Sequence, residues 1–117
     1  MFETALDEGE IITSVSFPIP EKANYQKFEQ PASRFALVGV FVAKTAGGVR
    51  VAVTGASEEG VFRWTEAETA LNGDFSENAI AGMSGNADSM ISDLHGTAAY
   101  RAHLVGVLTR RAVAACG

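Results

Sequence analysis

The sequence predicts a two-layer α+β fold, in which an antiparallel sheet of three to four strands is followed by about three helices packed on one face of the sheet. Three observations lead to this prediction. Apolar and polar residues alternate in several segments of the first half of the chain, as they do in half-buried strands. The turns between these segments are too short for crossover helices, so neighbouring strands should be antiparallel. Good helix formers are concentrated after residue 64, where apolar residues recur with helical spacing.

The first two expected strands cover residues 10–17 and 24–29. From Ile11 to Phe17 the side chains alternate in character, which predicts a strand with one wetter face, and the prolines that follow would end it. Residues 24–29 are mixed in composition, but their aromatic side chains favour a second strand.

The centre of the sheet is expected at residues 35–44, because apolar residues occupy both faces of this segment and both should therefore be covered. Residues 49–54 alternate valines with smaller or more polar side chains, which is typical of a half-buried partner strand. A turn at residues 45–48 joins the two strands, and its two glycines supply the positive φ that such turns often need.

Three helices are expected after the sheet. One runs from Thr65 to about Gly73, and a second, short one begins at Ser76 and continues to Met83. The last begins at Thr97 and should pack its apolar stripe on the sheet. The residues of this stripe are Tyr100, Leu104, Val107, Leu108 and Ala115, and the arginines expected off it are Arg101, Arg110 and Arg111.

Composition limits the classes of function. A chain of 117 residues with 47% hydrophobic residues fits a single domain spanning residues 1–117. Its net charge of -5 argues against nucleic acid or an anionic membrane surface as a partner. No apolar run approaches the roughly 20 residues that cross a bilayer, so membrane insertion is not expected. The single cysteine, Cys116, cannot form an intrachain disulfide, which fits a reducing compartment such as the cytoplasm.

Few side chains offer catalytic or metal-binding chemistry. No glycine-rich phosphate-binding pattern occurs, and the two histidines, His95 and His103, lack metal-ligand spacing, so no metal site is expected. Ser92, Asp93 and His95 are the residue types of a hydrolytic triad, but triad members normally converge from separate segments. Asp93 is therefore expected to organise the turn into the last helix.

Three segments, taken in order, resemble a known family. They are Phe28 to Val40, Val49 to Gly55, and Asp93-Leu94-His95-Gly96 ahead of Tyr100-Arg101. Together they resemble the C-terminal domain of the FAD-binding (medium) subunit of aerobic carbon monoxide dehydrogenase and xanthine dehydrogenase-type molybdenum hydroxylases. The resemblance extends over nearly the whole chain.

The resemblance implies that the chain belongs to a larger electron-transfer assembly. In this family an upstream domain binds most of the FAD, an iron–sulfur small subunit exchanges electrons with the flavin, and a large subunit carries the molybdenum. The upstream FAD-binding domain is expected to be absent here, because Met1-Phe2-Glu3 stands where it would end. The isolated chain is therefore expected to be inactive and to hold no cofactor by itself.

The resemblance also implies which loop comes near the flavin. This loop corresponds to Glu29 through Arg34, and its neighbouring cations, Lys27 and Arg34, are the candidate cofactor-binding residues. Several relatives carry a basic residue where this chain has Glu29, so a charge contact from that position is not expected. For Arg34, hydrogen bonding to turn carbonyls is the structural alternative.

Three functional hypotheses follow. The first is a non-catalytic C-terminal domain that covers the flavin domain and supports subunit assembly. The second is a free-standing binding or assembly module with no redox role, using the sheet face around Arg50 and Thr54. The third is a small enzyme built around Asp93 and His95.

Overall fold

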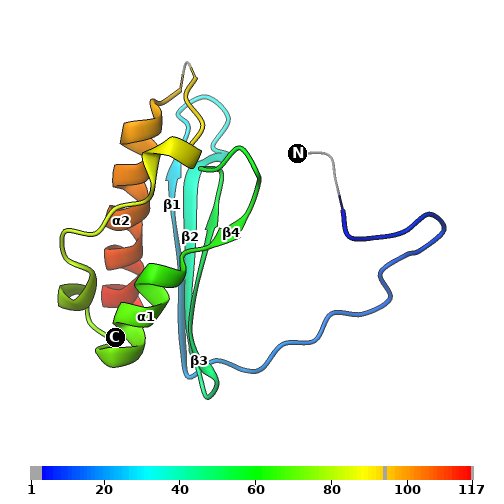
Figure 1. The fold of residues 1–117 in the computed structure, drawn as a ribbon, viewed down its shortest axis with the longest axis horizontal. Coiled ribbons are helices and arrows are strands. Elements are labelled where there is room, and N and C mark those ends of the chain that lie inside the picture. The colour runs from blue at the N-terminus through cyan, green and yellow to red at the C-terminus, as the bar shows by residue number, and fades with distance from the viewer. Residues whose placement is uncertain (1–3, 94, 117) are drawn as a thin grey trace.

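The structure, a computed structural model, describes residues 4–93 and 95–116. It confirms the two-layer α+β fold, with a four-stranded antiparallel sheet on one side and the helices on the other (Figure 1). The expected domain start at Met1-Phe2-Glu3 and Leu94 of the Asp93–Gly96 segment lie outside the described residues. The strands are β1 (Lys22–Glu29), β2 (Ala36–Thr45), β3 (Gly48–Thr54) and β4 (Phe62–Arg63); the helices are α1 (Thr65–Gly73) and α2 (Ala98–Cys116), with two 3₁₀ turns, η1 (Glu77–Ile80) and η2 (Ala87–Ser89).

Valines form the inner face of the sheet and most of the core. The strand order is β1-β2-β3-β4, so β2 is an interior strand as predicted. Three valines of β2 and three of β3 are fully or almost fully buried beneath the helices: Val38, Val40, Val42, Val49, Val51 and Val53. β-branched side chains suit this environment because their restricted rotamers pack well on a pleated surface.

The turn between β2 and β3 consists of Ala46 and Gly47. The Thr45 hydroxyl donates to the carbonyl of Gly48 over 2.8 Å and accepts from the Gly47 N–H over 3.2 Å. Gly48 alone has the positive φ, at 119°, that was expected of both glycines. A short turn of this kind fixes the register of the hairpin, which brings Val42 opposite Val51.

The strand predicted at residues 10–17 is wrong. The described part of this segment is extended chain that pairs with no strand, and Ile11 is 80% exposed. Alternation of side chains makes a strand only where a neighbouring strand can bond its backbone N–H and C=O groups. The fourth strand is β4 instead, in which Arg63 pairs with Ala52; its two residues are too few to show a period.

The first two helix predictions had different outcomes. Helix α1 spans the predicted residues, and it follows Trp64, whose N–H donates to the carbonyl of Val51 over 2.8 Å. The second helix is only the 3₁₀ turn η1, because the Ser76 side chain bonds the Asp74 carboxylate and makes no hydrogen bond to the backbone that begins η1. Gly82, with φ at 80°, then turns the chain away.

Helix α2 starts where predicted, and the Thr97 hydroxyl accepts from the N–H of Tyr100 over 3.1 Å. Leu104 and Leu108 are buried against the sheet as expected. Arg101, however, was predicted to lie off the buried stripe and is only 3% exposed. Its position follows the helix period, because Arg101, Val105, Leu108 and Ala112 lie on one face.

No helix within the described ranges 4–93 and 95–116 is long and apolar enough to cross a membrane. The larger of the two, α2, instead uses its apolar surface to cover the inner face of β1 and β2.

Leu104→Ala should lower the free energy of unfolding by roughly 2 to 5 kcal/mol, because it removes a buried side chain between α2 and the sheet. Urea denaturation measures this. The control is His103→Ala, an exposed position on the same helix, which should change the value by no more than about 0.5 kcal/mol. Equal midpoints for both variants would contradict the placement of α2.

Candidate functional site

One end of the sheet brings together three segments that the sequence analysis singled out. They are the loop from β1 to β2, the turn after β3, and the Asp93–Gly96 loop ahead of α2. Arg101 connects two of them to the start of β2. Its Nη1 donates to the carbonyls of Leu37 (2.8 Å) and Gly55 (3.0 Å), and its Nη2 donates to Oδ1 of Asp93 (2.9 Å).

Gly55 allows this arrangement. Its φ is 78°, and a Cβ at this position would lie 2.8 Å from the carbonyl oxygen of Leu37. Both the left-handed backbone and the close approach of β2 therefore require glycine. The Val49–Gly55 segment thus ends where Arg101 binds.

Asp93 organises the turn into α2, as expected. Its Oδ1 accepts from the backbone N–H of His95 over 2.9 Å, and its own N–H donates to the carbonyl of Gly96 over 3.0 Å. The N–H of His95 contributes most to a lowered pKa of the Asp93 carboxyl; partial burial opposes this, and Arg101 lowers the pKa further.

This geometry does not favour the small-enzyme hypothesis. The hydrogen bond between Asp93 and His95 comes from the histidine backbone, whereas a catalytic pair needs the carboxylate to orient the imidazole ring. The same carboxylate oxygen already accepts from Arg101. The hydrogen bonds of Asp93 therefore hold the turn ahead of α2 in place and do not orient a catalytic side chain.

The two cations proposed beside the flavin lie close together, Lys27 near the end of β1 and Arg34 on the loop that follows. Lys27 Nζ donates to the carbonyl of Arg34 over 3.4 Å and lies 3.7 Å from Oε1 of Glu29. Arg34 has a left-handed backbone with φ at 63°, and its N–H donates to the carbonyl of Gln30 over 2.9 Å. Both side chains are exposed, so they are free to meet a group outside this domain.

The structural alternative for Arg34 takes a different form from the one expected. Among the hydrogen bonds of residues 4–93 and 95–116, the Arg34 guanidinium makes none to a turn carbonyl; the loop is held by the backbone of Arg34 and by Lys27. Near the end of β1, the Phe28 ring meets Tyr100 of α2 edge to face, with centroids 6.1 Å apart. This aromatic pair fixes the loop relative to α2.

A buried carboxylate that sequence reasoning missed joins β3, β4 and α1. Glu68 accepts from the N–H of Val51 over 3.0 Å and from both Nε (3.0 Å) and Nη2 (2.6 Å) of Arg63. Burial by itself would raise the pKa of Glu68, but the bonds from Arg63 and Val51 and the charges of Arg63 and Arg50 outweigh it and lower the pKa. Its signal in the sequence is slight, because Glu68 lies in an ordinary helix-forming run.

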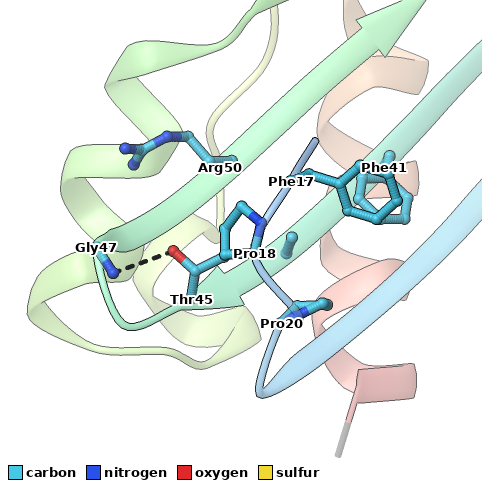
Figure 2. Close-up of a pocket in the computed structure, with 8 residues that line it drawn as sticks. Phe17, Pro18, Pro20, Phe41, Thr45, Gly47 and Arg50 are labelled. Atoms are coloured by element: carbon cyan, nitrogen blue, oxygen red, sulfur yellow. Dashed lines mark hydrogen bonds between the residues drawn. The ribbon is translucent and has the colours of Figure 1, made fainter. Parts of the chain in front are cut away.

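An apolar groove lies over the opposite end of the sheet, on the face turned away from the helices (Figure 2). Its volume is about 590 Å³. Phe17 and Phe41 both line it, and the Arg50 side chain extends away from the two rings (Figure 2). The lining residues are Phe17, Pro18, Pro20, Phe41, Ala43, Thr45, Gly47 and Arg50.

The described residues contain no cluster of three or more His, Cys, Asp or Glu side chains placed to hold a metal ion. Nor does the loop at Lys27 and Arg34 resemble an enclosed nucleotide site, since its cations are exposed and the large groove lies at the other end of the sheet. A flavin that met these exposed side chains would have to be held mainly by residues outside the described part of this chain.

The chain matches the family model of the CO dehydrogenase flavoprotein C-terminal domain over residues 23–116. The chain belongs to this family. It is also 36% identical to the nicotine 6-hydroxylase medium subunit of Paenarthrobacter nicotinovorans, in an alignment that covers 99% of this chain and 44% of that protein. The resemblance found in the sequence is therefore confirmed, and the chain is the C-terminal domain of a medium subunit of the molybdenum hydroxylase type.

Solved structures share the fold. The reconstituted CO dehydrogenase from Oligotropha carboxidovorans matches with a TM-score of 0.63 and 21% identity, covering 81% of this chain and 36% of that one. A cyanide-inactivated Cu,Mo-CO dehydrogenase matches with a TM-score of 0.62 and 22% identity, covering 85% and 37%. The chain thus spans less than half the length of each relative named here.

Arg101→Met should lower the free energy of unfolding by about 2 to 4 kcal/mol, because it leaves the carbonyls of Leu37 and Gly55 without their donor. Chemical denaturation measures the loss. Arg111→Met removes an exposed arginine from the same helix and should stay within about 0.5 kcal/mol of the unsubstituted chain. A loss of equal size in both variants would contradict the role of Arg101.

Asp93→Asn should flatten the acid dependence of stability. The native pKa of Asp93 lies below its unfolded value of about 3.9, so its contribution is present above that value and disappears as the pH falls through the native pKa. Unfolding free energies measured between about pH 6 and pH 2 should therefore fall less steeply in Asp93→Asn than in the unsubstituted chain. Parallel curves would show that Asp93 does not carry this dependence.

Proposed function

We propose that this chain is the non-catalytic C-terminal domain of the FAD-containing electron-transfer subunit of a carbon monoxide dehydrogenase-like molybdenum hydroxylase. There it covers the flavin domain and supports subunit assembly. The observation that carries the proposal is the family match over residues 23–116, together with relatives more than twice as long as this chain. Within residues 4–93 and 95–116, both histidines are exposed and the Asp93 carboxylate is already bonded to Arg101, which supports a non-catalytic role.

In this proposal the intact subunit holds FAD mainly through its flavin-binding domain, and the chain contributes Lys27 and Arg34 at the edge of the flavin. The bond from Lys27 of β1 to the Arg34 carbonyl ties the following loop to the strand and keeps the two cations close together. FAD supplies the electron transfer when bound. Positive charge near it favours its phosphates and the negative charge that reduction adds to the ring.

The proposed partners are the flavin-binding domain, an iron–sulfur small subunit and a molybdenum-containing large subunit. The name of the nicotine 6-hydroxylase relative, a medium subunit, supports a multi-subunit assembly. The single cysteine agrees with assembly in the cytoplasm. The substrate would bind to the large subunit, so this chain does not determine it.

A second candidate is a free-standing binding or assembly module without a redox role. Arg50 and Thr54 favour it, because both are exposed on the face of the sheet that no helix covers. This module would act without any flavin domain. The experiment below separates the two.

The test is an FAD titration followed by flavin fluorescence, with the chain alone and with a separately produced flavin-binding domain. We expect no binding by the chain alone and tighter FAD retention by the mixture. Lys27→Ala and Arg34→Ala should each weaken that retention several-fold, while Arg111→Ala, which removes an exposed charge from α2, should not. Arg34→Lys should restore it, because the charge is kept.

Two outcomes would contradict the proposal. FAD retention that is the same with and without the chain would remove the covering role. Tight FAD binding by the chain alone would mean that the domain has a flavin site of its own. If the chain improves FAD retention but Lys27→Ala and Arg34→Ala do not weaken it, the covering role stands and the proposed flavin contact of these two residues is wrong.

A further inference from the structure

We propose that the outer face of the sheet, together with the segment ahead of β1, is the surface on which this domain docks to the flavin-binding part of the medium subunit. The outer face is the side turned away from α1 and α2, and its central residues are Tyr25, Gly39, Phe41, Ala52 and Thr54. This inference rests on the proposed function and specifies which surface carries it.

Aromatic side chains occupy the middle of the outer face. Tyr25 and Phe41 are register partners in β1 and β2, and Phe41 also faces Ala52 of β3. Phe41 is 43% exposed although its strand lies in the interior of the sheet. The second face of an antiparallel sheet is commonly in water and polar, and here the helices cover only the other face (Figure 1). Aromatic side chains at the centre of an uncovered face are therefore unusual.

Gly39 leaves room on the outer face for the Tyr25 side chain. A Cβ there would collide with the Tyr25 hydroxyl and lie 2.7 Å from the Thr54 hydroxyl oxygen. Tyr25 therefore lies across the strand over Gly39, which flattens the outer face and leaves two hydroxyl groups beside the aromatic centre. Such a flat aromatic surface with a few polar groups is typical of protein interfaces.

The segment ahead of β1 extends the same apolar surface. Phe17, Pro18 and Pro20 line the groove with Phe41, and Phe17 is 77% exposed. Ile19 is 93% exposed. Further large apolar side chains of the segment, Ile11, Ile12 and Val15, are exposed as well. The part of the segment at the groove, Phe17, Pro18 and Pro20, therefore forms an exposed apolar surface with Phe41, and such a surface marks an interaction site.

The position of the segment favours the flavin-binding part as the occupant. The N–H of Glu21 donates to the carbonyl of Lys44 over 2.7 Å, so the chain leaves the sheet beside β2. From there it extends on the side opposite the helices (Figure 1). The matched family is a C-terminal domain, and more than half of each relative lies outside the matched region. That remainder would therefore reach this domain on its outer face.

Charge also distinguishes this face. Three cations lie around the aromatic centre: Lys27 of β1, Arg50 of β3 and Arg63 of β4. Two of them are already paired, because Lys27 lies 3.7 Å from Glu29 and Arg63 bonds the Glu68 carboxylate. Arg50 makes no ion pair within the described residues, so an acidic side chain on the occupant would suit its position.

The experiment measures binding of the full chain to the flavin-binding part of the nicotine 6-hydroxylase medium subunit by titration calorimetry. Phe41→Ser and Phe17→Ser should each raise the Kd at least tenfold. The control His103→Ser, on the exposed side of α2, should stay within twofold. Phe17 belongs to no strand, so Phe17→Ser tests the surface without disturbing the sheet.

The outcomes are distinguishable. If the unsubstituted chain binds and both outer-face variants bind equally well, the docking surface is wrong while the proposed function stands. If the unsubstituted chain does not bind at all, both are wrong. If the isolated chain is a dimer that Phe41→Ser converts to a monomer, a second copy is the occupant and the inference is overturned.

Discussion

The arrangement of this domain depends on one buried guanidinium. Arg101 connects α2 to the start of β2, to the turn after β3 and to the loop at Asp93. A buried cation is costly unless its donors are satisfied, and here two backbone carbonyls and a carboxylate accept from Nη1 and Nη2. The buried Nε has no partner among the described residues. Because Leu37 and Gly55 are fixed in this way, the adjoining loop with Lys27 and Arg34 has a defined position relative to the helix layer.

Much of the fold was accessible from the sequence, since it follows from side-chain period and burial. The valines of β2 and β3 and the apolar stripe of α2 indicated which faces meet. The errors arise where a local pattern needs a distant partner. Residues 10–17 alternate like a strand but have no strand beside them, and Arg101 has the composition of a surface residue but the helical position of a core residue. Its spacing to Val105 and Leu108 was the available signal.

The candidate site was predictable to a similar extent. Sequence resemblance selected Lys27 and Arg34, and the structure places the Lys27 ammonium of β1 against the Arg34 carbonyl of the next loop. The sequence did not indicate the hydrogen bonds of Glu68 or the exposed aromatic surface, because both depend on which strands become neighbours. Tyr25 and Phe41 are 16 positions apart and become partners only through the register of β1 and β2. Pairing of this kind has no local signature.

The order of the strands has a consequence for how the domain folds. Since β1, β2, β3 and β4 follow one another in both chain and sheet, each pairing closes only a short loop, which favours rapid formation of the sheet. The bonds of Arg101 instead join residues 64 and 46 positions apart. Their loop-closure entropy is larger, so the sheet should assemble as a meander before α2 docks and Arg101 fastens it.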